Sequence, residues 1–112
     1  MPRFDTSSER FISFDGAQLG LSVWDGQGEA QPSHVVVGVH GMNDWAAAFQ
    51  FAAPLWAEAG VTTYAYDQRG FGRSPNMGIW PEEHLMREDL HTALEIARRR
   101  HPEAVITVIG IS

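Results

Sequence analysis

Three short apolar segments separated by two helical ones constrain the fold of this chain most strongly. Residues 35–39, 61–66 and 105–109 are rich in β-branched and aromatic side chains and contain no charge. Near-continuous apolar runs are typical of strands buried on both faces, as in parallel sheets. Strands that alternate with helices predict an α/β fold, in which a mostly parallel sheet has helices on its faces.

The two helical segments have recognisable boundaries. Residues 44–59 place large apolar side chains on one face, but Pro54 would break or kink a continuous helix. We therefore expect a short turn first and then a helix around Pro54 that ends at Gly60. The second helix is expected to open at Pro81 and to end by His101, because the following Pro102 disfavours a helical predecessor.

The first part of the chain predicts an antiparallel hairpin. Residues 11–14 and 19–24 alternate between apolar and polar side chains, and Asp15-Gly16 between them is a strong hairpin signal. Residues 1–8 are expected to be irregular. Together these patterns predict one partial domain over residues 1–112, with five strands.

Composition excludes several classes of partner and chemistry. The net charge of −6 argues against nucleic acid or an anionic membrane as a partner. The absence of cysteine excludes disulfides, thiol catalysis and cysteine-based metal sites. No apolar run approaches the roughly 18 residues of a membrane span, so no stable membrane anchor is expected. The first ten residues lack the apolar core of a signal peptide, so a cytoplasmic protein is expected. The sequence makes no prediction of the oligomeric state.

Each of the three apolar segments is followed by a turn that could take part in catalysis. In an open α/β sheet, ligands bind where the carboxyl ends of the strands meet. His40-Gly41, after the first segment, is a turn that can direct a backbone N–H at a developing oxyanion. Residues 67–75 form a glycine-rich loop after the second. Gly110 and Ser112, after the third, match the first and third positions of the nucleophile elbow Gly-x-Ser-x-Gly.

These motifs, in this order, resemble the α/β-hydrolase superfamily. The likeness is greatest to the monoacylglycerol lipase and lysophospholipase-like serine hydrolases of the serine aminopeptidase S33 type. The segments that carry it are VVVGVHGMNDW, YAYDQRGFGRSP and VITVIGIS. The resemblance implies the N-terminal half of an α/β-hydrolase fold, truncated after the fifth strand. It also implies a small-molecule acyl ester or lipid as substrate, and no metal or organic cofactor.

The resemblance assigns roles to individual positions. Ser112 matches the nucleophile, and the backbone N–H of Met42 matches one donor of the oxyanion hole. The second donor and the acid and base of the triad would lie beyond Ser112. The remaining motif positions are expected to be structural: His40, Gly41, Asp67, Arg69, Gly70, Gly72 and Gly110. In the loop, the glycines would supply unusual backbone angles.

Two other patterns suggest different sites and are set aside. Gly70-x-Gly72 does not extend to a dinucleotide-binding fingerprint, because Pro75 occupies the place of its third glycine. His84, Glu88 and His91 share one helix face, as metal ligands can, but a solvated polar face explains them equally well.

Three alternative functions remain open from the sequence. The chain could be an inactive truncated fragment that lacks the acid and base of the triad. It could belong to an acyltransferase, which would use the same serine. It could also belong to a protein that uses the fold to bind a ligand without turnover.

Overall fold

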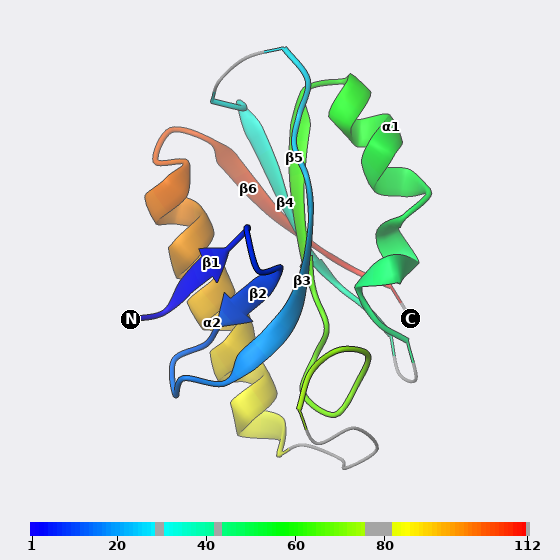
Figure 1. Ribbon diagram of the computed structural model, residues 1–112. Coiled ribbons are helices and arrows are strands. Elements are labelled where there is room, and N and C mark those ends of the chain that lie inside the picture. The colour runs from blue at the N-terminus through cyan, green and yellow to red at the C-terminus, as the bar shows by residue number, and fades with distance from the viewer. Residues whose placement is uncertain (29–30, 42–43, 76–81, 112) are drawn as a thin grey trace.

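In the computed structural model, the described residues 1–28, 31–41, 44–75 and 82–111 form a six-stranded mixed sheet with helices on both faces (Figure 1). The strand order is β1-β2-β3-β5-β4-β6. The strands are β1 (Arg3–Asp5), β2 (Arg10–Ile12), β3 (Gln18–Trp24), β4 (His34–Val39), β5 (Val61–Tyr66) and β6 (Val105–Gly110). The helices are the 3-10 helix η1 (Ala46–Phe49) and the α-helices α1 (Ala52–Glu58) and α2 (Glu83–Arg100). The predicted α/β architecture is confirmed.

The predicted parallel half of the sheet is β5, β4 and β6, with β4 in the middle. Val39 pairs with Tyr66 on one side and with Gly110 on the other. The three strands therefore end together, and the turns that follow them lie at one edge of the sheet.

The other half of the sheet is antiparallel. β2 and β3 form the predicted hairpin, in which Ile12 pairs with Gln18. Gly16 in the connecting turn has a φ of +87°, a conformation that favours glycine. β3 then pairs with β5 in antiparallel fashion and joins the two halves.

The expectation that residues 1–8 are irregular is wrong, because Arg3–Asp5 form β1. This strand pairs with β2 and places Phe4 opposite Phe11. The ring centroid of Phe4 lies 5.5 Å from that of Phe11 and 4.7 Å from that of Tyr64. A three-residue strand with one apolar side chain is too short to show an alternating pattern, so only these tertiary contacts reveal it.

Side chains of the central strands alternate between two apolar layers. Toward α2, the core contains Val35, Val37, Tyr64 and Tyr66 together with Ala93, Ile96 and Ala97 of the helix. Toward α1, Ala65 packs with Ala46, Phe49 and Ala53. Gly38 leaves room for the Phe49 ring, since a Cβ at that position would lie 2.7 Å from Cζ. The glycine thus allows η1 to lie close to the sheet.

The predicted helix ends at Gly60 and before His101 are confirmed, whereas α2 begins at Glu83 and its predicted start, Pro81, lies outside the described residues. A 3-10 turn precedes α1, and Gly60, with a φ of +88°, follows it. Pro54 lies in the first turn of α1, where a missing N–H costs little. α2 ends before His101, and Arg98 Nη1 donates hydrogen bonds to the carbonyl oxygens of Pro102 and Ala104.

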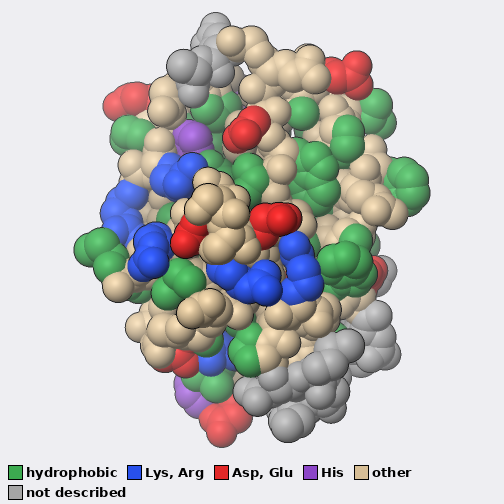
Figure 2. All heavy atoms as spheres, in the orientation of Figure 1, with side chains coloured by type: hydrophobic (Ala, Val, Ile, Leu, Met, Phe, Trp, Pro, Cys, Tyr) green, Lys and Arg blue, Asp and Glu red, His purple; other side chains and the backbone are tan. Residues whose placement is uncertain are grey.

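The surface is chemically mixed. On the face shown in Figure 2, acidic and basic side chains lie interspersed and hydrophobic side chains show between them. Among the residues that the structure describes, no helix has the length and apolar character needed to cross a membrane.

The junction between α2 and β6 contains a buried histidine. Arg100 Nε donates to the Tyr64 hydroxyl oxygen at 3.1 Å, and the hydroxyl lies 2.7 Å from His101 Nε2. His101 Nδ1 lies 2.9 Å from Gln31 Oε1. These partners fit a neutral ring that accepts at Nε2 and donates at Nδ1. Burial, followed by the charge of Arg100, lowers the pKa of His101, while Asp25 opposes the shift weakly.

We expect His101 to make the fold less stable in acid. Its folded-state pKa lies below the ordinary value of about 6.5, so the unfolded chain binds more protons in that window. The neutral His101 ring therefore contributes its full stabilisation of the fold above about pH 6.5, and this contribution is lost as the pH falls below that value. Between pH 7.5 and pH 5.5, the urea midpoint of unfolding should fall further for the wild type than for His101→Gln. The exposed His91 provides a control, since His91→Gln should keep the wild-type loss. Equal losses in all three proteins would contradict the assignment.

Candidate active site

The turns after β4 and β6 are neighbours at the carboxyl edge of the sheet. Val39, the last residue of β4, pairs with Gly110, and its carbonyl oxygen accepts a hydrogen bond of 3.0 Å from the N–H of Ile111. Met42 and Ser112, the predicted oxyanion donor and nucleophile, lie outside the described residues. The structure therefore describes the backbone as far as Gly41 and Ile111, the residues that precede Met42 and Ser112.

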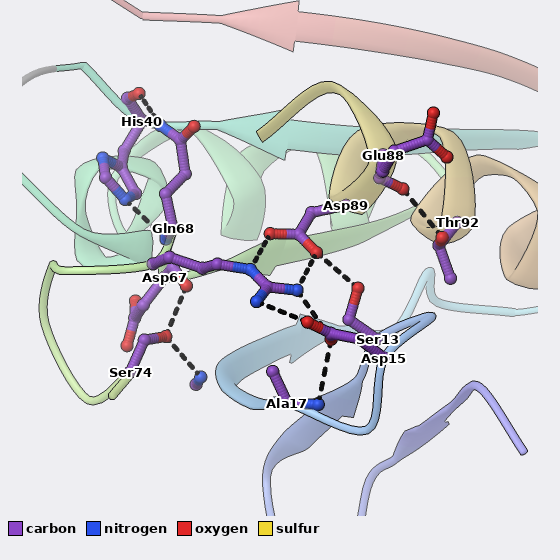
Figure 3. Close-up of polar contacts among 12 residues, drawn as sticks. Ser13, Asp15, Ala17, His40, Asp67, Gln68, Ser74, Glu88, Asp89 and Thr92 are labelled. Atoms are coloured by element: carbon purple, nitrogen blue, oxygen red, sulfur yellow. Dashed lines mark hydrogen bonds and ion pairs between the residues drawn. The ribbon is translucent and has the colours of Figure 1, made fainter. Parts of the chain in front are cut away.

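His40 is buried just after β4, and both of its ring nitrogens have hydrogen-bond partners. Figure 3 shows its contacts with Gln68. Its Nε2 accepts a hydrogen bond of 2.9 Å from the backbone N–H of Gln68. Its Nδ1 lies 2.7 Å from the carbonyl oxygen of Gly41. Because a backbone N–H can only donate, Nε2 carries no proton and Nδ1–H donates to Gly41. A ring with both nitrogens occupied in this way is not available as a general base.

Asp67 lies fully buried in the loop after β5. Its Oδ1 accepts a hydrogen bond of 2.7 Å from the N–H of Ala46, at the start of η1. Its Oδ2 accepts from the backbone N–H and the Nε–H of Arg73, at 2.9 and 2.7 Å. The Ser74 hydroxyl donates to the backbone carbonyl of Asp67. The carboxylate thus joins its own loop to the segment after the β4 turn.

Glycines surround this carboxylate closely. A Cβ at Gly20 of β3 would overlap Asp67 Oδ2, and one at Gly72 would lie 2.8 Å from its Cγ. Gly72 and Gly70 have φ values of +52° and +82°, which supply the unusual angles expected of the loop. Nothing lies within 4 Å of a Cβ placed at Gly110, so no contact among the described residues explains that glycine.

Arg69 joins the same loop to helix α2 and to the β2–β3 turn. Its Nε and Nη2 donate to the two carboxylate oxygens of Asp89 at 2.7 and 2.8 Å. Its Nη1 and Nη2 donate to Asp15 at 2.8 and 2.7 Å. The hydrogen bonds from Arg69 lower the pKa of Asp15, and those to Asp89 and Asp15 raise the pKa of Arg69. The Ser13 hydroxyl also donates to Asp89.

Sequence reasoning missed two residues of this site. Asp89 lies on the buried face of α2, with Ala93 and Ile96 at helical spacing. A carboxylate on a buried helix face requires a cation or hydrogen-bond donors. The position of Asp89 on that face could therefore have indicated a cationic partner such as Arg69. Gln68 was missed because no local sequence pattern distinguishes it. Its side-chain amide donates a hydrogen bond of 2.9 Å to the carbonyl oxygen of His40, which is distant in the sequence.

The histidines of α2 form no site in the described part of the chain. His84 and His91 are exposed, and their nearest carboxylates are those of Glu82 and Glu95, at 3.2 and 3.6 Å. Within residues 1–28, 31–41, 44–75 and 82–111, no group of three or more His, Asp or Glu side chains is arranged to hold a metal ion.

Removing Arg69 should strongly destabilise the fold. The Asp89 side chain is 2% exposed, so Arg69→Ala leaves a buried charge without its cation. Breaking such a pair is expected to cost about 3–5 kcal/mol in the free energy of unfolding, measured by urea denaturation. Replacing both partners, by Arg69→Met with Asp89→Leu, should cost less than Arg69→Ala. Arg87→Ala is the control, because its pair with Glu83 is exposed and contributes under about 1 kcal/mol. Similar losses for Arg69→Ala and Arg87→Ala would contradict the role of the buried pair.

Comparison with known proteins identifies the family. The sequence pattern described as serine aminopeptidase, S33, matches residues 30–112. A monoacylglycerol lipase of Mycolicibacterium smegmatis is 32% identical over 111 residues. That alignment covers 95% of this chain but only 38% of the lipase, so the chain spans well under half of its relative.

Solved structures share the fold. A monoglyceride lipase from Saccharomyces cerevisiae superimposes with a TM-score of 0.74 at 23% identity, over 99% of this chain and 36% of its own. A carboxyl esterase from Bacillus coagulans gives a TM-score of 0.74 at 24% identity, over 88% and 34%. The described architecture thus corresponds to about a third of these proteins. From its matched sequence and its fold, the chain belongs to the serine aminopeptidase S33 family of α/β-hydrolases.

Proposed function

We propose that this chain supplies the nucleophile and one oxyanion donor of a serine hydrolase that cleaves carboxylic esters. The observation that supports this most directly is the pairing of Val39 with Gly110. It brings the carboxyl end of β4, with Gly41 after it, and Ile111 after β6 to the same edge of the sheet. A nucleophile and an oxyanion donor must lie on either side of one carbonyl group, so their backbones have to be neighbours.

The proposed reaction is acyl transfer through Ser112. A histidine from later in the protein takes the hydroxyl proton as Oγ forms a bond to the ester carbonyl carbon, whose π electrons move to the oxygen. The N–H groups of Met42 and of the residue after Ser112 hold that oxyanion. Collapse breaks the bond to the alcohol oxygen, which receives the proton from the histidine. Water then releases the acid by the same steps, with the serine as the leaving group.

Monoacylglycerols or lysophospholipids are the proposed substrates. Support comes from the relative in Mycolicibacterium smegmatis, whose name is monoacylglycerol lipase. The acid, the base and the second oxyanion donor would all come from residues beyond Ser112. The proposal therefore concerns the extended protein, meaning the product of translation that continues past codon 112.

In the extended protein, Ser112→Ala should abolish covalent labelling by a fluorophosphonate probe, because the phosphorus is captured by the serine Oγ. The matched control is Ser33→Ala, at an exposed serine, which should label like the wild type. The 112-residue chain should not hydrolyse p-nitrophenyl esters above buffer, since the proposed base lies beyond Ser112. Labelling that persists in Ser112→Ala would place the nucleophile elsewhere.

A further inference from the structure

We propose that Gln68 is a positioning residue for the proposed reaction. It holds His40 in place, and His40 in turn holds the peptide that follows Gly41. The inference rests on the proposed function, because it concerns the oxyanion donor on that peptide. Gln68 lies in the loop after β5, and in the described part of the chain its side chain binds the main chain of His40. Its effect on the proposed oxyanion donor would pass through the His40 ring and the Gly41 carbonyl.

The contacts form a continuous chain of hydrogen bonds (Figure 3). The side-chain Nε2 of Gln68 donates to the carbonyl oxygen of His40 at 2.9 Å, and its backbone N–H donates to His40 Nε2 at 2.9 Å. One residue therefore holds both the main chain and the ring of His40. The ring packs edge-on against Phe71, with centroids 5.4 Å apart, which further limits its rotation.

The fixed ring in turn holds the carbonyl of Gly41. His40 Nδ1–H donates to that oxygen at 2.7 Å, and the N–H of Asp44 approaches it at 3.3 Å. A trans peptide is planar, with its N–H opposite its C=O. The carbonyl of Gly41 and the N–H of residue 42 belong to one such unit, so a bond that sets the direction of the first also sets that of the second.

The far end of the turn is held from the same loop. Asp67, the neighbour of Gln68, accepts the N–H of Ala46 at 2.7 Å. Two adjacent residues of the β5 loop therefore bind described residues on either side of positions 42 and 43, Gln68 at His40 and Asp67 at Ala46.

Gln68→Glu tests the proposal by replacing the amide donor with a carboxylate of the same shape. In the extended protein, it should lower kcat for a p-nitrophenyl ester by about tenfold and leave KM within about twofold, because the donor acts mainly in the transition state. Gln68→Met should do the same without adding a charge. Gln50→Glu, at an exposed position, is the matched control and should keep the wild-type kcat. Wild-type kcat in both Gln68 variants would overturn the proposal.

A second pair of variants separates positioning from packing. His40→Asn places a donor near the position of Nδ1, whereas His40→Gln places its amide near Nε2. If the bond to Gly41 matters, the Asn variant should keep the higher kcat at similar thermal stability. Equal kcat values, or a higher value for the Gln variant, would mean that His40 only fills space.

A readout that needs no activity separates failure of this proposal from failure of the proposed function. Nitrogen-15 NMR of the His40 ring in the extended protein should show a proton on Nδ1 and none on Nε2, because the backbone N–H of Gln68 donates to Nε2 and the carbonyl of Gly41 accepts from Nδ1. A proton on Nε2 would overturn the proposal even in an active enzyme. An inactive wild type that takes no fluorophosphonate would refute the hydrolase assignment, while the ring measurement would still decide whether Gln68 and His40 hold the peptide.

Discussion

The buried carboxylate of Asp67 is the constraint on which the carboxyl edge of the sheet depends. A charge without solvent must be matched by donors, and Asp67 obtains them from Arg73 and from the N–H of Ala46. Its partners come from its own loop and from the segment after the β4 turn. Gly20 of β3 lies against it with no room for a side chain. The position of the turn is thus coupled to the shape of the β5 loop and to the course of β3.

A network of ion pairs around Arg69 ties this edge to the rest of the molecule. Arg69 connects the loop to Asp89 on α2 and to Asp15 in the β2–β3 turn. Since a guanidinium forms a planar fork of donors, it can bind two carboxylates in defined directions. The antiparallel half of the sheet and the α2 layer are held to the loop by one side chain. The amino-terminal strands therefore contribute to the site although they bear none of the proposed catalytic groups.

Much of this arrangement follows from the sequence, for physical reasons that differ between elements. The β4, β5 and β6 strands are almost continuous apolar runs, and Gly16, Gly60 and Pro102 mark turns by backbone geometry alone. The strand β1 could not be predicted, because its single buried side chain is recognised only against Phe11 and Tyr64. The same is true of Gln68, whose role depends on a residue 28 positions earlier in the chain. Local patterns predict elements and turns, whereas long-range polar contacts require the fold.

The strand order has a consequence for synthesis on the ribosome. β4 is made before β5 and β6, yet it lies between them and pairs with both. At about 5–20 residues per second, the chain needs about 1–5 s to grow from the end of β4 to the end of β5. During that time the valines of β4 have neither parallel partner, and those on the α2 side wait longer for their helix. The emerging chain therefore has an interval in which the apolar strand β4 is exposed to any chaperone that binds extended apolar segments.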